Sequence, residues 1–329
     1  MFAWADGSHL DSLPEIMNSI SPNGVACDGA RRGQKCKKTW VATYANSTLR
    51  NPVNTELPKS GHKGEQVSMK CNKHNSKQHD YSFNFWIGCH KISEGCKNCY
   101  MFHAQNRRGV DPEDVRRCMT TWGQPIKWQK EAEKAGEYKS VFACSYSDFF
   151  MAEADEWRDD AWALIRKTPN LIWHLITKRT HLIADRLPAD WGSGYPNVWL
   201  GASVELKKRL YRLDELRKIP CVLRWVDFAP TLEDLMPELA EHIGGFGWVC
   251  ASGETGCNVN QPRPWKPQWA RNIRDLCKER SIHFYFSQTG GKPRYNSRLL
   301  DGVEYNGVPP LNQPHEQKQP DRPEEGGAP

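Results

Sequence analysis

The segment "LIWHLITKR" at residues 171–179 decides the fold, because a nearly unbroken apolar run leads directly into polar residues. A run of this length without polar alternation is typical of a parallel strand that is covered on both faces. Runs of the same kind are "FNFWIG" 83–88, "VFACS" 141–145, "NVWLGAS" 197–203, "CVLRWVDF" 221–228, "GWVCAS" 247–252 and "IHFYFSQ" 282–288. The chain is therefore expected to contain a parallel sheet.

Between these runs, apolar residues recur at the spacing of an amphipathic helix. The recurring positions are Trp157, Ala161, Leu164 and Ile165, then Leu206, Leu210 and Leu213, and then Trp269, Ile273, Leu276 and Cys277. Repeated strand, helix, strand units predict either a parallel α/β barrel or a doubly wound sheet.

Polar residues follow nearly every expected strand. They are Ser145, Ser147 and Asp148; Thr177, Lys178 and Arg179; Ser203 and Glu205; Asp227; Ser252 and Glu254; and Gln288 and Thr289. In parallel α/β folds the ligand lies beyond the carboxyl ends of the strands, so these side chains predict a ligand site. For each one singly, the alternative is a local role such as capping the next helix, or, for Glu205, a first-turn acid.

Three cysteines stand close together in "GCHKISEGCKNCY", residues 88–100, directly after the first expected strand. Thiolates suit zinc and iron-sulfur clusters, and a cluster with three protein sulfurs leaves one iron open to another ligand. The alternative is zinc bound by Cys89, Cys96, Cys99 and His103, since His103 follows Cys99 by one helical turn. The spacing alone leaves both metals open.

Composition limits the class of protein. The chain has 329 residues, 38% of them hydrophobic, and this is enough to bury a core. Its twelve cysteines are spread along the chain apart from the close trio, which fits metal binding better than a disulfide framework. No long apolar run indicates a membrane span and no secretory signal is evident, so we expect a cytoplasmic protein without a membrane partner.

The sequence divides into three regions. Residues 1–80 form a basic N-terminal extension, in which residues 27–77 carry eleven Lys and Arg. This charge suits either a phosphate-binding surface or a solvated arm. Cys27, Cys36, Cys71 and His74 lie there, but their spacing fits no common zinc pattern. Residues 81–308 form the α/β domain, and the Pro- and Gln-rich tail 309–329 is expected to be disordered.

Several segments resemble a known family in the same order along the chain. They are "FNFWIGCHKISEGCKNCY", "SYSDFF", "LITKR", "VWLGASVE", "WVDFAP", "CASGETG", "PRPWKPQWARNIRDLC", "FYFSQTGG" and "RLLDGVEYNGVP". They are similar to segments of a phage and prophage family with a three-cysteine motif, which is regarded as radical S-adenosylmethionine (SAM) proteins. The resemblance covers about residues 81 to 308 and implies a partial TIM-type barrel that binds a [4Fe–4S] cluster and SAM.

The resemblance also implies roles for individual residues. Cys89, Cys96 and Cys99 match the cluster ligands. The matched segments place the SAM-binding rim at Ser145, Ser147, Asp148, Lys178, Ser203, Glu205 and Glu254. This chain has six residues between its first two cysteines where the usual radical motif has three, and Asn98 where that motif has an aromatic residue. Adenine stacking is then expected from Tyr100 or Phe102.

Members of this family resemble radical enzymes of phages that hypermodify thymidine in their DNA. This implies an isomerase that converts a glycine joined to the thymidine methyl group through nitrogen into one joined through its α-carbon, which helps viral DNA evade host restriction. The partners implied are DNA carrying modified thymidine, which the basic residues 27–77 would contact, and an electron donor such as flavodoxin or ferredoxin, in the host cell cytoplasm. Lys178 or Arg179 is expected to hold the substrate carboxylate or a phosphate.

Two other functions fit the same residues. One is a radical SAM lyase or repair enzyme that acts on nucleic acid. The other is a non-catalytic zinc or iron-sulfur module that binds DNA, although the polar residues at six strand ends exceed what such a module needs.

Overall fold

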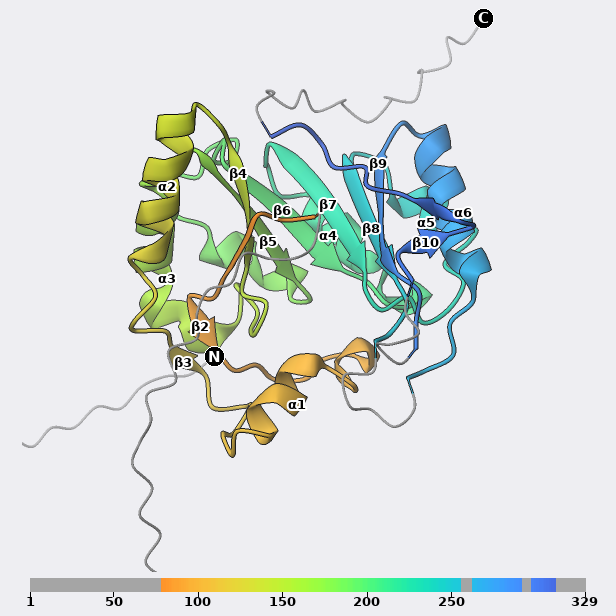
Figure 1. The fold of residues 1–329 in the computed structure, drawn as a ribbon, viewed down its shortest axis with the longest axis horizontal. Helices are drawn as coiled ribbons and strands as arrows, with labels where there is room; N and C mark the ends of the chain where they lie inside the picture. Colours follow the sequence, from red (N-terminus) through yellow and green to blue (C-terminus); the bar gives the residue numbers. More distant parts are fainter. Residues whose placement is uncertain (1–77, 256–261, 292–296, 312–329) are drawn as a thin grey trace, which may run out of the picture. The chain divides into compact units, whose positions relative to one another are not determined.

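The fold is that of a computed structural model, which describes residues 78–255, 262–291 and 297–311 (Figure 1). Most of the basic extension lies outside these residues, including Cys27, Cys36, Cys71 and His74, and so does the tail from residue 312. Among the described residues, no helix combines the length and the apolar character needed to cross a bilayer.

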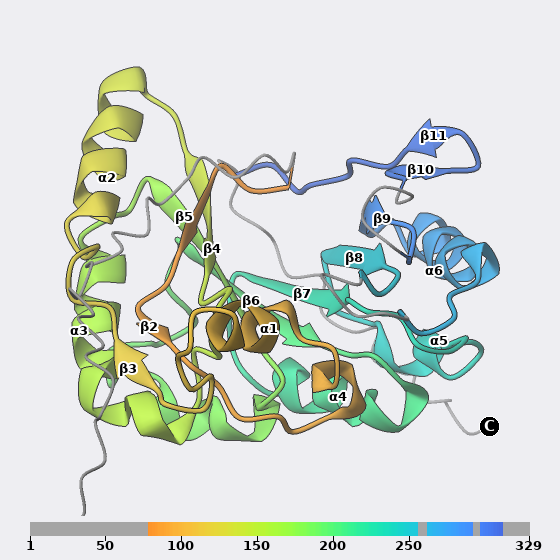
Figure 2. The same cartoon turned by 60° about the horizontal axis from the view of Figure 1, so that its bottom comes forward.

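Seven parallel strands form one sheet in the order β1-β4-β5-β6-β7-β8-β9. Their bounds are β1 Tyr81–Phe83, β4 Lys139–Ala143, β5 Leu171–Thr177, β6 Val198–Ser203, β7 Leu223–Phe228, β8 Trp248–Ser252 and β9 His283–Gln288. Figures 1 and 2 show that the sheet curls into an open half-barrel. The predicted α/β fold with a partial TIM-type barrel is thus confirmed, and a doubly wound sheet is not formed.

Helices cover one face of this sheet. They are α2 Gln124–Ala135, α3 Asp155–Arg166, α4 Tyr211–Arg217, α5 Leu239–His242 and α6 Pro267–Glu279. The apolar residues that recur at helical spacing, such as Ala161, Ile165, Ile273 and Leu276, are buried in the core between the helices and the sheet. A hairpin of β10 Leu299–Leu300 and β11 Val303–Glu304 follows the last strand.

Two elements differ from the sequence prediction. The expected strand at 83–88 is divided, because β1 ends at Phe83 and β2 (Trp86–Ile87) pairs antiparallel with β3 (Arg116–Arg117). Between them, the side chain of Asn84 accepts a hydrogen bond from the Tyr146 amide (2.8 Å) in place of a backbone partner. The helix expected to begin at Glu205 begins only at Tyr211, after the 3₁₀ turn η5 (Lys207–Arg209), because the backbone of Leu206 is extended.

The other face of the sheet carries a layer of rings inside the half-barrel. Each of six strands contributes one member: Phe142, His174, Trp199, Trp225, Trp248 and Tyr285. The rings pack closely, with His174 stacked on Trp199 at 4.5 Å and Trp225 near Trp248 at 5.0 Å between centroids. Gly201 leaves room for the Trp225 ring, since a Cβ there would lie 2.4 Å from it. This aromatic layer fills the amino-terminal half of the barrel interior.

Candidate functional site

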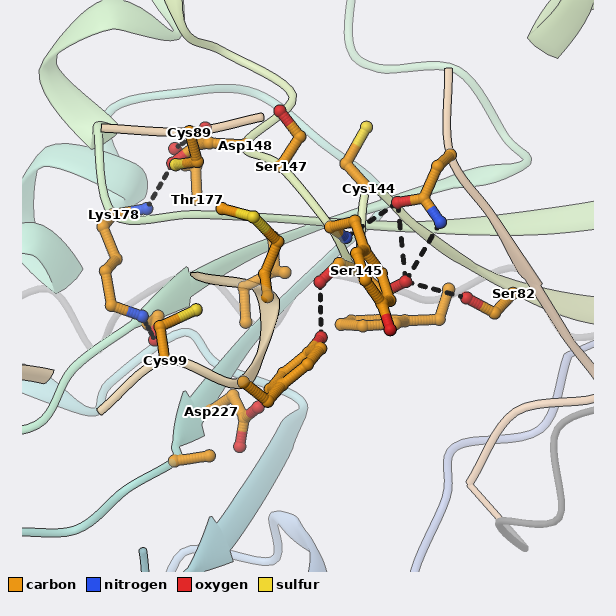
Figure 3. Close-up of a pocket in the computed structure, with 18 of the residues that line it drawn as sticks. Ser82, Cys89, Cys99, Cys144, Ser145, Ser147, Asp148, Thr177, Lys178 and Asp227 are labelled. Atoms are coloured by element: carbon orange, nitrogen blue, oxygen red, sulfur yellow. Dashed lines mark hydrogen bonds between the residues drawn. The ribbon is translucent and has the colours of Figure 1, made fainter. Parts of the chain in front are cut away.

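A cavity of about 1320 Å³ lies above the aromatic layer, at the carboxyl ends of the strands (Figure 3). Its walls include most of the residues that the sequence predicts for the site. These are Cys89, Cys96, Cys99, Tyr100, Ser145, Ser147, Asp148, Lys178 and Ser203. Except for Ser203 on β6, these residues lie in segments that follow strands, and such segments meet at one edge of a parallel sheet, which explains the convergence.

The cysteine-bearing segment 88–100 crosses the carboxyl ends of the strands. It contains the 3₁₀ turn η1 (Glu94–Cys96) and leads into α1 (Tyr100–Asn106), whose N-cap is Cys99. Gly88, which starts the segment, has a φ of 108°, and a Cβ there would lie 2.4 Å from the Asp114 carbonyl oxygen. Cys89, Cys96 and Cys99 are free thiols of intermediate exposure on the cavity wall.

Two buried glutamates fasten this segment to the sheet. The Ser93 hydroxyl donates to Glu205 Oε1 at 3.1 Å, and the Asn98 amide donates to Glu254 Oε2 at 2.9 Å. The Glu205 side chain is fully buried and that of Glu254 is 5% exposed, and neither lines the cavity. Their contacts are therefore with the cysteine-bearing segment, and the predicted cofactor contact of both residues stays a prediction.

Arg263 strengthens the same attachment. Its guanidinium donates to the Glu254 carboxylate and, at 2.8 Å, to the Glu94 carbonyl oxygen of η1. Burial acts to raise the pKa of Glu254, but the hydrogen bonds from Arg263 and Asn98 hold it below its usual value. The role of Arg263 is not evident from the sequence, because a contact between residues 169 positions apart produces no local sequence pattern.

Lys178 extends into the cavity from the end of β5. Its Nζ donates to Ser203 Oγ at 2.6 Å and lies 3.1 Å from Glu205 Oε1. Glu205 also contacts Arg212 Nη1 at 3.1 Å, so one buried carboxylate faces two cations. Burial lowers the pKa of Lys178, but the charge of Glu205 outweighs it and the pKa is raised overall. Lys178 therefore carries a positive charge at the cavity wall.

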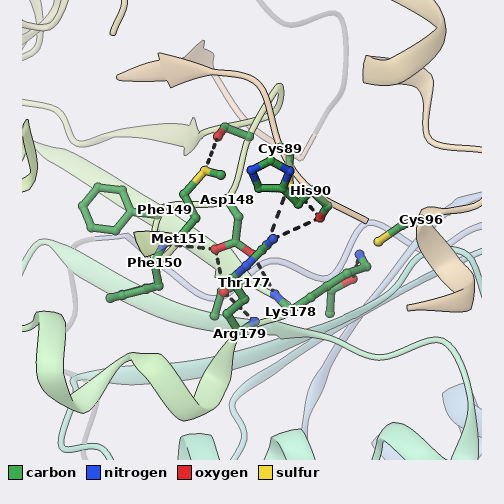
Figure 4. Close-up of polar contacts among 12 residues, drawn as sticks. Cys89, His90, Cys96, Asp148, Phe149, Phe150, Met151, Thr177, Lys178 and Arg179 are labelled. Atoms are coloured by element: carbon green, nitrogen blue, oxygen red, sulfur yellow. Dashed lines mark hydrogen bonds and ion pairs between the residues drawn. The ribbon is translucent and has the colours of Figure 1, made fainter. Parts of the chain in front are cut away.

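Asp148 and Arg179 form a second buried pair, which contacts the first cysteine (Figure 4). Arg179 Nη1 lies 3.0 Å from Asp148 Oδ2 and 3.8 Å from Cys89 Sγ, and Nη2 donates to the His90 carbonyl oxygen at 3.0 Å. Asp148 also accepts bonds from the Thr177 hydroxyl and from backbone amides of Phe150 and Lys178. Both side chains are thus held in one position.

The thiol of Cys89 reflects these neighbours. Burial raises its pKa to about 12, and the charge of Asp148 acts in the same direction, whereas Arg179 lowers it. As the cation nearest to Cys89 in this group, Arg179 stabilises negative charge on the sulfur.

The segment after β4 supplies the hydroxyl and aromatic groups of the cavity. Ser147 Oγ donates to the Gly88 carbonyl oxygen at 2.6 Å, and the Tyr100 hydroxyl donates to the Ser145 carbonyl oxygen. The Tyr100 ring is 42% exposed and meets the Tyr146 ring edge to face at 5.7 Å. Tyr146 also lines the cavity and was missed in the sequence, where nothing distinguishes it from other tyrosines.

Phe102, the second residue expected to stack on adenine, is more buried than Tyr100. Phe102 is only 8% exposed, and Lys91 Nζ stands 4.5 Å from its ring centroid. A planar ligand therefore has easier access to Tyr100 than to Phe102.

Asp227 lies at the end of β7 and lines the same cavity. Its Oδ1 atom is buried and has no hydrogen-bond partner among the described residues. Burial raises the pKa of Asp227 to about 7; the negative charge of Glu205 adds to this shift, and Lys178 opposes it. The carboxyl group is thus partly protonated near neutral pH.

The side chains of the site do not form a compact site for a single metal ion. In the part of the chain that the structure describes, no three His, Cys, Asp or Glu side chains stand close enough together to hold one. His103, the expected fourth zinc ligand, is not among the residues that line the cavity, whereas all three thiols are.

The fold and the site define a partial TIM-type barrel with a cysteine-bearing segment fastened across the carboxyl ends of its strands. The chain belongs to the family described as "Protein of unknown function (DUF5131)", whose sequence pattern matches residues 75–309. A comparison with curated proteins finds no match.

Proposed function

We propose that this chain is a radical SAM enzyme of phage DNA modification, which isomerises N-linked glycinyl-thymidine to the form linked through the α-carbon. One observation carries the proposal: three cysteine thiols of a single segment line one cavity at the carboxyl ends of a partial TIM-type barrel. The resemblance of about residues 81 to 308 to the phage three-cysteine family supports the choice of substrate.

The donor set fits an iron-sulfur cluster. Cys89, Cys96 and Cys99 would hold it, because iron-sulfur clusters are bound by cysteine thiolates. A cluster also spans a larger distance between its ligands than a single metal ion does. When bound together, the cluster and SAM supply a one-electron cleavage of the SAM C–S bond, and with it a radical that removes a hydrogen atom. The residues of the chain position the reactants: Tyr100 and Tyr146 offer rings, and Ser203 and Lys178 offer polar contacts.

The size of the cavity supports a substrate beside the cofactor. Ordinary ligand pockets have volumes of roughly 300–1,000 Å³, and this cavity, at about 1320 Å³, exceeds them. A base in DNA must leave the helical stack to enter such a cavity. The positive charge of Lys178 suits the glycine carboxylate of the substrate. A flavodoxin or ferredoxin of the host cytoplasm is the proposed electron donor.

The first test is chemical analysis of the protein after anaerobic purification. We expect iron and sulfide to be bound, and 5'-deoxyadenosine to be released after reduction in the presence of SAM. Ala in place of Cys89, Cys96 or Cys99 should abolish both. Cys221→Ala is the matched control, because Cys221 is buried and does not line the cavity. Zinc without iron, and no deoxyadenosine, would contradict the proposal and favour a zinc module.

The second test concerns the substrate. DNA containing N-linked glycinyl-thymidine is incubated with the reduced enzyme and SAM, and its nucleosides are separated by chromatography and mass spectrometry. The product has the same mass as the substrate but a different retention time and fragmentation. Deoxyadenosine release without this product would retain the enzyme class and exclude the substrate.

A further inference from the structure

Asp227 occupies a central place on the cavity wall. Its neighbours across the sheet are Ser203 on β6 and Cys250 on β8, so it projects inward from the middle of the half-barrel. Figure 3 shows it in the same cavity as Lys178 and Cys99. Among the described residues, the Asp227 carboxyl group makes no hydrogen bond to the cysteine-bearing segment. Glu205 and Glu254, in contrast, both bond to it.

The hydrogen bonding of Asp227 is incomplete among the described residues. Asp148, the other aspartate of the cavity, accepts bonds on both oxygens, from Thr177 and Phe150 on Oδ1 and from Lys178 and Arg179 on Oδ2. By comparison, Oδ1 of Asp227 is buried and has no partner there. A buried acceptor without a donor is energetically costly, and native proteins rarely retain one without a reason. A donor on a ligand would remove this cost.

The surface beside Asp227 suits a flat ring. Phe142, a member of the aromatic layer, and Ile176, which packs against this layer, both line the cavity. The Trp225 ring lies on β7, two residues before Asp227. Bases that enter enzyme pockets are held by apolar or aromatic contacts to their faces and by hydrogen bonds to their edges. Asp227 provides the edge contact beside such a surface.

We infer that Asp227 binds the substrate directly, with its carboxyl oxygen accepting a hydrogen bond from an N–H group of the modified base. The inference rests on the proposed function. The substrate carries two such groups, the ring N3–H of the thymine and the N–H of the attached glycine. Both are N–H donors, but the ring N3–H is neutral, whereas the glycine nitrogen is a secondary amine that is protonated near neutral pH, and the experiment distinguishes them.

The experiment measures binding of three nucleosides to the full-length protein containing its cluster and SAM, without reductant. The probes are N-linked glycinyl-thymidine, its N3-methyl derivative and its derivative with two methyl groups on the glycine nitrogen, which keeps the positive charge but has no N–H. Each is titrated calorimetrically into the wild type and into Asp227→Leu. Methylation of the N–H that bonds Asp227 should weaken wild-type binding roughly ten-fold, and should change binding to Asp227→Leu less than two-fold.

Comparing both proteins removes the steric effect of the methyl group, which remains when Asp227 is replaced. Asp227→Asn keeps an acceptor oxygen of the same shape, so it should retain most of the sensitivity to methylation. Asp227→Ala, which also lacks the acceptor, replaces Asp227→Leu if the leucine variant does not fold, as judged by circular dichroism. The methyl group that loses its effect in Asp227→Leu identifies the bonded N–H.

Three results would overturn the inference. If both methylations cost the same in the wild type and in Asp227→Leu, Asp227 does not bind either N–H, and the proposed function is unaffected. If Asp227→Asn is as insensitive to methylation as Asp227→Leu, the carboxyl oxygen is not the acceptor. If the wild type binds no probe at all, both this inference and the proposed substrate are wrong.

Discussion

Asp148 and Asp227 show how two aspartates of one cavity differ through their neighbours alone. Asp148 is paired with Arg179 and accepts hydrogen bonds from several donors, so both of its oxygens have partners. Asp227 has the charges of Lys178 and Glu205 nearby. Its own negative charge acts to raise the pKa of Tyr100 and of Cys250. Its carboxylate form is the one that burial disfavours.

Stability should therefore depend on pH through Asp227. Its pKa is about 7 in the folded chain against an ordinary 3.8, so the folded state holds a proton that the unfolded state has lost between these values. Stability then falls as pH rises through this window, by an amount on the order of 4 kcal/mol. Asp227→Asn removes this dependence, so its advantage over the wild type should grow from pH 4 to pH 7 in urea unfolding. An advantage that does not vary with pH would contradict this.

Arg179 is expected to matter for the cluster as well as for the fold, since its removal also leaves the buried Asp148 carboxylate without its cation. Arg179→Met removes its contacts with Cys89 and the His90 carbonyl, and should lower bound iron per chain at least two-fold after reconstitution. Arg179→Lys keeps the charge but cannot bridge Asp148 and His90 together, so its bound iron per chain should lie between the values of the wild type and Arg179→Met. Arg271→Met, at an exposed pair with Asp301, is the control. Full iron content in Arg179→Met would exclude this role.

Sequence alone located part of this site. The cysteines and the polar strand ends are recognisable, because metal ligands and inward-facing residues have local patterns. The roles of Glu205, Glu254 and Arg263 depend on which loop lies above them, and that depends on the packing of segments far apart in the chain. Asp227 was placed at a strand end, but its missing hydrogen-bond donor appears only in three dimensions.

At the level of elements, the cysteine-bearing segment is set by one close approach. Gly95 in η1 packs against Glu205, and a Cβ there would lie 2.4 Å from the Glu205 Cγ. Since Glu205 is fully buried and bonded to Ser93, Lys178 and Arg212, it cannot move aside easily. The turn between Cys89 and Cys96 therefore requires glycine at this position.

Gly95→Ala should displace η1 and separate Cys96 from the other two thiols. We expect iron incorporation to fall several-fold, while the thermal unfolding midpoint changes little, because the segment lies outside the main core. Gly123→Ala is a matched control, since a Cβ there meets no atom of the described residues within 4 Å. Unchanged iron content in Gly95→Ala would show that the segment tolerates the extra carbon.

The sequence predicted which strands and helices form more accurately than it predicted where they begin and end. The parallel strands were predictable because burial on both faces makes them continuously apolar. The break after Phe83 was not, because the side chain of Asn84 replaces a backbone partner there. The delayed start of α4 likewise follows from Leu206, whose extended backbone no helical pattern reveals.

For the whole molecule, the sequence places a strongly basic region before the barrel. Residues 1–64 contain eight of the eleven Lys and Arg of residues 27–77. A protein that contacts DNA phosphates through such residues releases counterions, so its affinity falls steeply with salt. We expect the region to act as the DNA contact of the proposed enzyme.

Deleting residues 1–64 should weaken DNA binding and flatten its dependence on salt. Fluorescence anisotropy with a duplex oligonucleotide at several salt concentrations measures both, and binding of the free nucleoside should be unaffected. An unchanged affinity and an unchanged slope would assign DNA binding to the barrel itself.

The aromatic layer has a consequence for entry into the cavity. Because buried rings fill one end of the half-barrel, that end offers no path inward. A substrate of the proposed enzyme would therefore enter from the carboxyl ends of the strands or through the open side of the half-barrel. Substitutions that enlarge side chains at the aromatic end should leave the rate of entry unchanged.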